Sequence, residues 1–277
     1  MRKAVIVLEK NEWSEPKWFF HHTRTERPDS GSFERHCHDR YELLYVEEGE
    51  GRYAVEGVEY PLRANTAILL PPYSYHYVRP EEQVPYERFV IHFQPDLLDP
   101  ALRASPVLGQ GTNGAVYFPA ETLGNDFAAT LRLLSATLQA GGGGKDGPEA
   151  VMRGTLSLLL GRLCAVKPAP PTQDPDNRAA QMIAYLNDHL TERLTLDDMA
   201  RRFYINKFYL CRLFREETGM TVFAYLHTKR IAMAEQLLQT GIPAAEVAER
   251  VGFSDYSTFW RAYRKQTGRP PVRPMPD

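Results

Sequence analysis

The sequence contains few cysteines, and they show no pairing. Cys37, Cys164 and Cys211 are the only three among 277 residues, and no two share the close spacing of a paired motif. Small secreted domains that depend on disulfides carry an even set of cysteines at regular spacings. We therefore do not expect a disulfide framework.

Long hydrophobic runs are also missing. The apolar stretch at residues 4–8 is followed at once by Glu9 and Lys10, and no later stretch is longer. A secretory signal or a membrane-spanning helix needs a much longer apolar segment. We therefore expect no membrane partner.

Net charge is small, but it is unevenly distributed. The chain has 33 lysines and arginines and 35 aspartates and glutamates, a formal charge of −2. From Arg178 onward there are fifteen basic and eleven acidic residues, +4, which leaves −6 for the first 177 residues. The length allows two domains. A basic C-terminal part on an acidic N-terminal part is typical of a nucleic-acid-binding module joined to a second domain.

One pattern occurs twice between residues 195 and 271. Met199-Ala200 and Val247-Ala248 lie 48 residues apart, whereas Thr218-Gly219 and Thr267-Gly268 lie 49 apart. Repetition at such a period indicates a duplicated supersecondary unit. Each copy has the apolar spacing of a short helix followed by a longer one, so the sequence predicts two helix–turn–helix units.

Helix-start signals and small residues support the two units. Thr195, with an acid three residues later, is typical of a helix start. Asn206 and Asp255 precede the second helix of each unit and are favoured capping residues. Ala200 and Ala248 fall where two crossing helices come closest, and a small side chain suits that position.

The second helix of each unit is predicted to read DNA. An apolar face turns inward, and the opposite face carries arginines with aromatic residues, Arg212 in one unit and Arg261 at the matching position of the other. A major groove accepts such a helix, and an arginine can bridge O6 and N7 of guanine. The candidate DNA contacts are Asn206, Lys207, Phe208, Cys211, Arg212, Arg215, Ser257, Thr258, Trp260, Arg261 and Arg264. The alternative is a solvated charged face, but its recurrence in register favours DNA.

Further basic residues are candidates for sequence-independent contacts to phosphate. They are Arg201, Arg202, Lys207, Arg215, Lys229, Arg264 and Lys265. Such contacts give affinity without base selectivity.

Residues 178–273 resemble the AraC/XylS family of bacterial transcription regulators. The resemblance rests on residues 210–214 and 247–253, on Thr218-Gly219, on Arg230-Ile231 with Ala234, and on Gly268-Arg269-Pro270-Pro271. It implies a regulator, more often an activator, that binds double-stranded DNA and a small effector. A homodimer and contact with RNA polymerase are further expectations. Read together with this module, the cysteine content fits the cytoplasm.

The N-terminal half has the pattern of an antiparallel β-sandwich or barrel. Short strands separated by turn residues are predicted at 4–8, 17–25, 41–47, 51–56, 58–62, 67–70, 75–78 and 86–93. Many short strands at even spacing are typical of such folds. We therefore expect an α+β multidomain protein: a barrel, appended helices and an all-α DNA-binding domain.

A cluster of histidines occurs within these strands. If residues 36–42 form a strand, His36, His38 and Glu42 share one face, and His76 follows on a later strand. The pattern resembles the cupin metal motif, although Pro72-Tyr73-Ser74 departs from its second part. Three imidazoles and a carboxylate would suit Fe, Mn, Ni or Zn. The alternative is a metal-free cavity whose polar groups hydrogen-bond an effector.

The sequence is compatible with three hypotheses about the effector and the activity. Tyrosines at 45, 53, 60, 73, 75 and 77 favour a sugar, whose apolar faces stack on such rings. A metal-dependent isomerase or dioxygenase joined to a DNA-binding domain is a second hypothesis. No separate general acid or base stands out, so we do not expect an enzyme. A third hypothesis, a regulator without an effector, predicts a filled barrel.

Two amphipathic helices are predicted between the barrel and the DNA-binding part, at 125–139 and 149–166. The resemblance implies that they form a dimer interface, and the alternative is packing within one subunit. Prolines mark a linker after them. The expected domains are an effector-binding barrel at 1–123, a dimerisation segment at 124–166, a linker at 167–177 and a DNA-binding domain at 178–277.

Overall fold

The computed structural model describes residues 6–29, 31, 33–109, 115–141, 146–170 and 177–271. The chain divides into two compact units, Met1–Gln173 and Asp174–Asp277. The division falls in the stretch predicted to be a linker, of which residues 171–176 lie outside the described part. Residues 4 and 5 of the first predicted strand also lie outside it.

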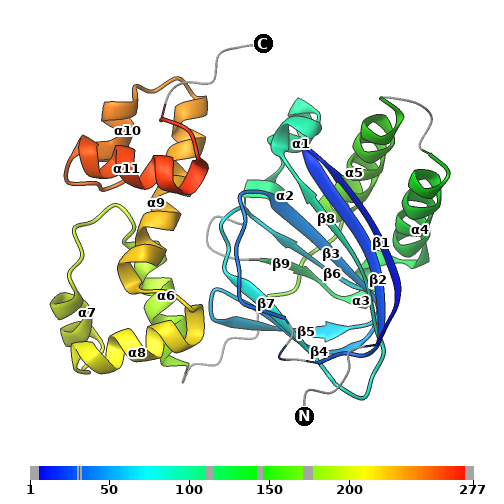
Figure 1. Cartoon of the computed structure of the whole chain (residues 1–277), viewed down its shortest axis with the longest axis horizontal. Coiled ribbons are helices and arrows are strands. Elements are labelled where there is room, and N and C mark those ends of the chain that lie inside the picture. Colours follow the sequence, from blue (N-terminus) through cyan, green and yellow to red (C-terminus); the bar gives the residue numbers. More distant parts are fainter. Residues whose placement is uncertain are drawn as a thin grey trace. The chain divides into compact units, whose positions relative to one another are not determined.

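The first unit is built on two antiparallel sheets (Figure 1). The larger sheet has the order β1-β2-β8-β3-β6-β9, and the smaller has the order β5-β4-β7. The strands are β1 Ile6–Glu15, β2 Trp18–Arg27, β3 Tyr41–Glu48, β4 Glu50–Val55, β5 Val58–Arg63, β6 Thr66–Leu70, β7 His76–Pro80, β8 Tyr86–Phe93 and β9 Val116–Phe118. The predicted antiparallel β domain is confirmed.

Alternation along β3 separates two apolar cores. Leu43 and Tyr45 belong to a core shared with the helices of this unit, whereas Leu44 and Val46 belong to a core shared with the smaller sheet. Successive strand residues point to opposite faces. Since Glu42 is two residues before Leu44, it lies on the same face as that second core, between the sheets.

Helices cover the other face of the larger sheet, as Figure 1 shows for α4 and α5. They are α1 Pro100–Arg103, α2 Pro106–Gly109, α3 Ala120–Leu123, α4 Asn125–Gln139 and α5 Gly147–Ala165, with a 3₁₀ turn at Pro95–Leu97. Residues 100–123 contain α1, α2, β9 and α3, none of which the sequence analysis predicted.

The leucines on the inward faces of α4 and α5 are buried within their own chain. Leu131 and Leu134 of α4, and Leu156 and Leu159 of α5, are at most 1% exposed and share one core with the larger sheet. This is the packing that we considered as the alternative. The outward faces of the two helices carry Leu133 and Leu158, which are 67% and 54% exposed.

The second unit is helical. Its helices are α6 Arg178–Asp188, α7 Leu196–Arg202, α8 Lys207–Thr218, α9 Val222–Gln239, α10 Ala244–Arg250 and α11 Tyr256–Thr267. The predicted caps are confirmed: Thr195, Asn206 and Asp255 each accept a hydrogen bond from the backbone N–H three residues later. No helix in the described part of the chain is long and apolar enough to cross a membrane.

Helix α9 ties the two helix–turn–helix units together. Ile231 and Ala234 on α9 share a core with Val247 and Phe259 of the second unit. Arg230, on the same helix, donates from Nε to the carbonyl of Leu190 at 2.6 Å and from Nη2 to the carbonyl of Glu192 at 2.7 Å. The loop that precedes α7 is thereby fixed to α9.

Candidate functional site

The segment that carries His36 and His38 is not a strand, contrary to the sequence prediction. Between residues 36 and 40 the backbone is irregular apart from one isolated bridge, and β3 begins at Tyr41. The bridge joins His36 and His76 through N–H···O=C bonds of 3.1 and 3.0 Å. The N–H of Tyr73 donates to the carbonyl of His38 at 2.7 Å. Main-chain pairing therefore brings the histidines together without strand alternation.

The four predicted pocket residues lie together. One ligand atom from each of His36, His38, Glu42 and His76 falls within 4.8 Å of those of the other three. Glu42 is 4% exposed. Its Oε2 lies 2.8 Å from Nε2 of His38 and 3.3 Å from Nε2 of His76. Glu42 is thus the centre of the cluster.

Two further side chains reach Glu42: the sequence prediction missed His92, and it noted Tyr53 only as a ring that could stack on a sugar. Nε2 of His92 lies 2.9 Å from Oε2 of Glu42, and the Tyr53 hydroxyl donates to Oε1 at 3.0 Å. Burial alone would raise the pKa of Glu42, but His76 and the hydrogen bonds from the imidazoles hold it well below its usual value. Glu42 is therefore a buried carboxylate anion.

In three of the imidazole rings, the hydrogen bond made by Nδ1 defines the tautomer. Nδ1 of His36, His38 and His76 lies 2.8–3.0 Å from the carbonyls of Glu34, Arg40 and Ser74, respectively. A carbonyl oxygen only accepts, so each Nδ1 carries a proton. In a neutral ring, Nε2 then presents a lone pair. Three such lone pairs converge near one carboxylate.

This arrangement requires positive charge at its centre. Two acceptors, such as a neutral His38 Nε2 and a Glu42 oxygen, repel each other at 2.8 Å. Either protons on Nε2 or a metal cation would resolve the conflict. The donor set fits a divalent metal, because an Nδ1–H bonded to a main-chain carbonyl is the usual support of a ligating imidazole. A bound cation would supply an open coordination position for a polar ligand.

Three residues of the cluster, His36, Glu42 and His76, line a cavity of about 430 Å³ between the sheets. The lining side chains are His21, Phe33, Glu34, His36, Glu42, Leu44, Tyr53, His76, Tyr77, Val78, Tyr86, Arg88, Val90 and His92. A filled barrel is therefore ruled out. Of the tyrosines noted from the sequence, Tyr53 and Tyr77 line the cavity, and those at 45, 60, 73 and 75 are not among the lining residues.

Strand β8 contributes four of these residues at alternate positions. Tyr86, Arg88, Val90 and His92 line the cavity, whereas Phe89 and Ile91 between them enter the core beneath the helices. Residues 86–93 were predicted as a strand, so the alternation itself was a usable signal. What the sequence could not supply was the pairing of Glu42 with His92 across the sheet.

Helix α8 presents the predicted outward face. Phe208 is 81% exposed, and Arg212 and Arg215 are exposed with no ion pair to any residue that the structure describes. The guanidinium of Arg212 lies 5.3 Å from the Tyr209 ring centre. Cys211 is half-buried, and Asn206 is engaged as the helix cap.

Helix α11 repeats this arrangement. Arg261 and Arg264 are exposed and, within the described residues, make no ion pair. Arg264 stacks over the half-buried Trp260 at 5.1 Å from the ring centre. Ser257 is exposed, and the Thr258 hydroxyl donates to the capping carboxylate of Asp255 at 2.8 Å. The two helices thus carry unpaired arginines at equivalent positions.

The remaining basic residues predicted to contact phosphate differ in whether their charge is exposed and free of an acidic partner. Arg201 pairs with Asp198, and Lys207 lies 3.3 Å from a carboxylate oxygen of Asp197. Lys229 is 5% exposed, so it was wrongly predicted as a phosphate contact. The exposed cations Arg202 and Lys265 remain available.

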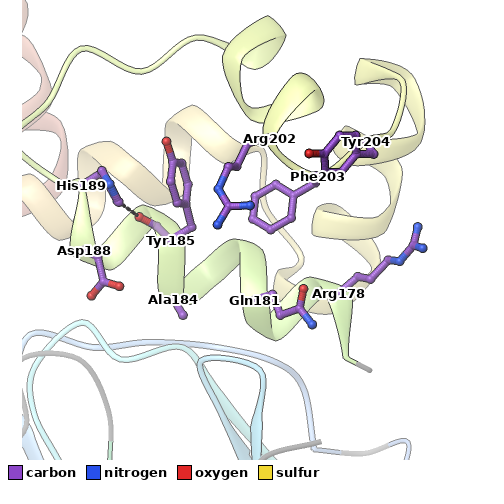
Figure 2. Close-up of a pocket in the computed structure, with 9 residues that line it drawn as sticks. All are labelled: Arg178, Gln181, Ala184, Tyr185, Asp188, His189, Arg202, Phe203 and Tyr204. Atoms are coloured by element: carbon purple, nitrogen blue, oxygen red, sulfur yellow. Dashed lines mark hydrogen bonds between the residues drawn. The ribbon is translucent and has the colours of Figure 1, made fainter. Parts of the chain in front are cut away.

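A second, larger depression of about 750 Å³ lies in the helical unit, between α6 and the end of α7 (Figure 2). The Tyr185 and His189 rings stack at 4.1 Å, and Phe203 meets Tyr185 edge-on. Charged groups of both signs line it, Arg178 and Asp188 among them. None of its nine lining residues, all of them described, has a buried polar side-chain atom without a partner. We assign it no ligand.

Comparison with known proteins gives matches in both units. The family model described as an AraC-like ligand binding domain matches residues 23–152, and one described as a helix-turn-helix domain matches residues 199–273. The chain is 25% identical over 230 residues to the uncharacterized HTH-type transcriptional regulator YbfI of Bacillus subtilis, covering 81% of this chain and 80% of that protein. It is 26% identical over 246 residues to the HTH-type transcriptional activator RhaS of Salmonella arizonae, covering 87% and 86%.

A solved structure, ToxT from Vibrio cholerae, aligns with a TM-score of 0.36 and 15% identity, covering 93% of this chain and 96% of that one. The two curated relatives are named as transcriptional regulators, which favours a regulator over the metal-dependent enzyme considered from the sequence. Taken together with the ligand-binding and helix-turn-helix matches, they show that the chain belongs to the AraC family of transcription regulators.

Proposed function

We propose that this protein activates transcription in the cytoplasm by binding a specific DNA sequence in response to a small effector, a sugar or a sugar derivative. DNA binding is supported above all by the equivalent positions of Arg212 and Arg261 in the two units. Both are exposed on the second helix of a helix–turn–helix unit, and neither has a carboxylate partner among the described residues. An unpaired guanidinium is ready to form the bidentate contact that reads guanine.

The two arginines read different parts of one site. We would select the preferred DNA sequence from a random pool with the full-length protein and then measure the affinities of Arg212→Ala and Arg261→Ala. Each substitution weakens binding by about 1–3 kcal/mol and relaxes base choice in its own half of the site. Arg250→Ala is the matched control, because Arg250 is exposed on α10 but paired with Glu246 at 2.6 Å.

Equal binding of selected and random DNA by the parent protein would overturn the proposal. Parent-like affinity and base choice in both arginine variants would remove these residues from the interface.

The cavity between the sheets is the proposed effector site. Its volume of about 430 Å³ is in the range of pockets that hold small organic ligands. Tyr53, Tyr77 and Tyr86 contribute aromatic walls, which suit the apolar faces of a sugar. An effector would act by binding better to one arrangement of the protein than to another.

A divalent transition metal, Zn, Ni, Fe or Mn, is proposed between His36, His38, Glu42 and His76. The convergent Nε2 lone pairs support it. Protein purified without chelators or a histidine tag should contain close to one metal ion per chain by mass spectrometry, and His36→Ala should lose it. The Nδ1 of His36 bonds the Glu34 carbonyl, whereas Glu42 is bonded by His38, Tyr53 and His92, so this variant leaves the carboxylate network in place. Absence of metal from the parent would leave protons as the balancing charge.

Pairing of two subunits is proposed through the outward faces of α4 and α5. Their exposed Leu133 and Leu158 support it. Sedimentation of the parent and of a Leu133→Glu, Leu158→Glu double variant tests it: the parent is a dimer and the variant a monomer. As an activator, the dimer on DNA would contact RNA polymerase.

A further inference from the structure

The cavity between the sheets has a cationic end that the histidine cluster does not use. On paired strands β3 and β8, Glu42 lies opposite His92, Leu44 opposite Val90, and Val46 opposite Arg88. Four residues of strand separate the Cα atoms of Arg88 and His92 by about 13 Å. Leu44 and Val90 occupy the wall between. The cavity therefore runs from an imidazole–carboxylate end, past an apolar wall, to an arginine.

Arg88 has no counter-ion in the described part of the chain. Within the described residues it makes no hydrogen bond and no ion pair, and its Nη1 is buried without a partner. Its guanidinium lies 5.2 Å from the Phe33 ring centre and 4.7 Å from that of Tyr86. The two rings fix the orientation of the guanidinium and leave its N–H groups unused. Arg88 as a whole is partly buried, but a buried guanidinium N–H without an acceptor is unfavourable unless a ligand supplies one.

Tyr86 adds a second unused donor beside Arg88. Its side chain is fully buried, and its hydroxyl also has no partner in the described structure. Burial raises the pKa of Tyr86 to about 12, so the hydroxyl keeps its proton and can donate. An arginine fork with one neighbouring hydroxyl matches the oxygens of a carboxylate.

The charges in the cavity favour one negative charge on the ligand rather than two. Arg88 is the single lysine or arginine in the lining, which also contains the carboxylates Glu34 and Glu42. His21 adds no charge, because burial and Arg88 lower its pKa to about 3. A carboxylate is balanced by Arg88 alone, whereas a phosphate dianion would not be.

We propose that the effector is a small carboxylic acid, held by Arg88 and Tyr86, with hydroxyl groups that reach the Glu42–imidazole end. This rests on the proposed function, since it takes the cavity to be the effector site. It narrows the effector from sugars in general to the acidic derivatives, in which a carboxylate and hydroxyl groups lie at opposite ends of a short chain.

Matched pairs of an acid and a neutral compound test the proposal on the full-length protein. Thermal unfolding is measured with acetate against acetamide, and with D-gluconate against D-glucose, at constant ionic strength. We expect each acid to raise the melting temperature more than its neutral partner. Inorganic phosphate is a further arm, expected to stabilise less than acetate at equal concentration.

Variants test whether stabilisation by acetate depends on Arg88. Arg88→Gln should raise the acetate Kd at least tenfold and leave the melting temperature without ligand unchanged or higher, because it removes an unpaired charge. Tyr86→Phe should weaken acetate binding several-fold. Arg52→Gln is the control, since Arg52 is an exposed arginine of β4, 69% exposed at its side chain.

The outcomes separate this inference from the proposed function. Equal shifts from acetate and acetamide, or an acetate response that survives in Arg88→Gln, would overturn the carboxylate site. Stronger stabilisation by phosphate would also overturn it. DNA binding, measured on the same samples without ligand, reports on the proposed function independently, and Arg88→Gln should bind the selected DNA as the parent does.

Discussion

Tyr204 and Gly252 occupy equivalent turn positions in the two helix–turn–helix units, and both have a left-handed backbone, with φ of 53° and 86°. Tyr204 is 92% exposed, so its side chain is unconstrained by packing. A Cβ on Gly252 would lie 2.5 Å from the carbonyl oxygen of Thr191. The same turn therefore tolerates a large residue in one unit and requires glycine in the other.

Substitutions at these two positions should have opposite effects on stability. Tyr204→Gly relieves a left-handed strain of about 1–2 kcal/mol against a glycine entropy cost of about 0.5–1 kcal/mol. We expect a gain of up to about 1.5 kcal/mol. Gly252→Ala combines the strain with the clash at Thr191 and should cost about 2 kcal/mol or more. Urea unfolding followed by circular dichroism measures both, and a neutral Gly252→Ala would contradict the close approach.

The sequence predicted the helical unit well because its signals are local. Caps at Thr195, Asn206 and Asp255 and the apolar periodicity lie within one turn of the helices that they define. In the β domain, the short strand β9 of three residues offered no alternation to detect. Glu42 and His92, which pair between β3 and β8, are 50 positions apart in the chain.

The pocket shows the same limit. His36, His38, Glu42 and His76 were grouped by a motif, although the strand inferred at 36–42 does not exist. His92 and Arg88 carried no motif, and their place became visible only through the register of β3 and β8. Alternation within residues 86–93 could have indicated a shared face, but not which face meets the cavity.

The helix caps predict a difference in acid sensitivity between the two units. Asp255 caps α11, and bonds from the Thr258 N–H and hydroxyl lower its pKa. The pKa of Asp255 is lower in the folded state than in the unfolded state. The contribution of this cap to stability is therefore fully present above about pH 4, near the unfolded pKa. It is lost as the pH falls through the folded-state pKa. Asn206, at the equivalent position, does not titrate.

Asp255→Asn should therefore match the parent in melting temperature at pH 7 and exceed it near pH 3, which thermal unfolding at both pH values would measure. Asn206→Asp should add to the acid sensitivity of the first unit, in which Asp198 already has a lowered pKa because of its hydrogen bond with Thr195. An identical pH profile for parent and Asp255→Asn would show that the carboxylate plays no part in the acid response.

Salt dependence should separate the arginines by their partners. Arg215 and Arg264 have no ion pair in the described structure, so Arg215→Ala and Arg264→Ala should each reduce the slope of log K against log salt by about 1. The weakening should be uniform across selected and random DNA. Fluorescence anisotropy over a series of salt concentrations measures it. Arg201→Ala serves as the comparison and should change the slope less, because Arg201 already pairs with Asp198.

Arg230 should contribute to stability through its geometry as well as its charge. Arg230 is 6% exposed, and its guanidinium bonds two carbonyls of one loop. Charge-assisted hydrogen bonds contribute about 1.5–3 kcal/mol, so we expect Arg230→Met to destabilise the protein by that amount. Arg230→Lys should recover less than half, because an ammonium lacks the planar fork. Full recovery by lysine, in the same urea experiment, would mean that charge alone matters.

The attachment of the loop at residues 190–192 to α9 has a consequence for the DNA itself. Inserting one base pair between the two halves of a binding site rotates the second half by about 35° around the helix axis. Two independently mobile units could follow that rotation through a change at their joint. Here Arg230 anchors the loop and Gly252 packs against Thr191, so the two units cannot rotate relative to each other. The DNA must untwist instead for both units to bind. Operators for this protein should therefore keep one fixed spacing between their halves while varying freely in the bases between them.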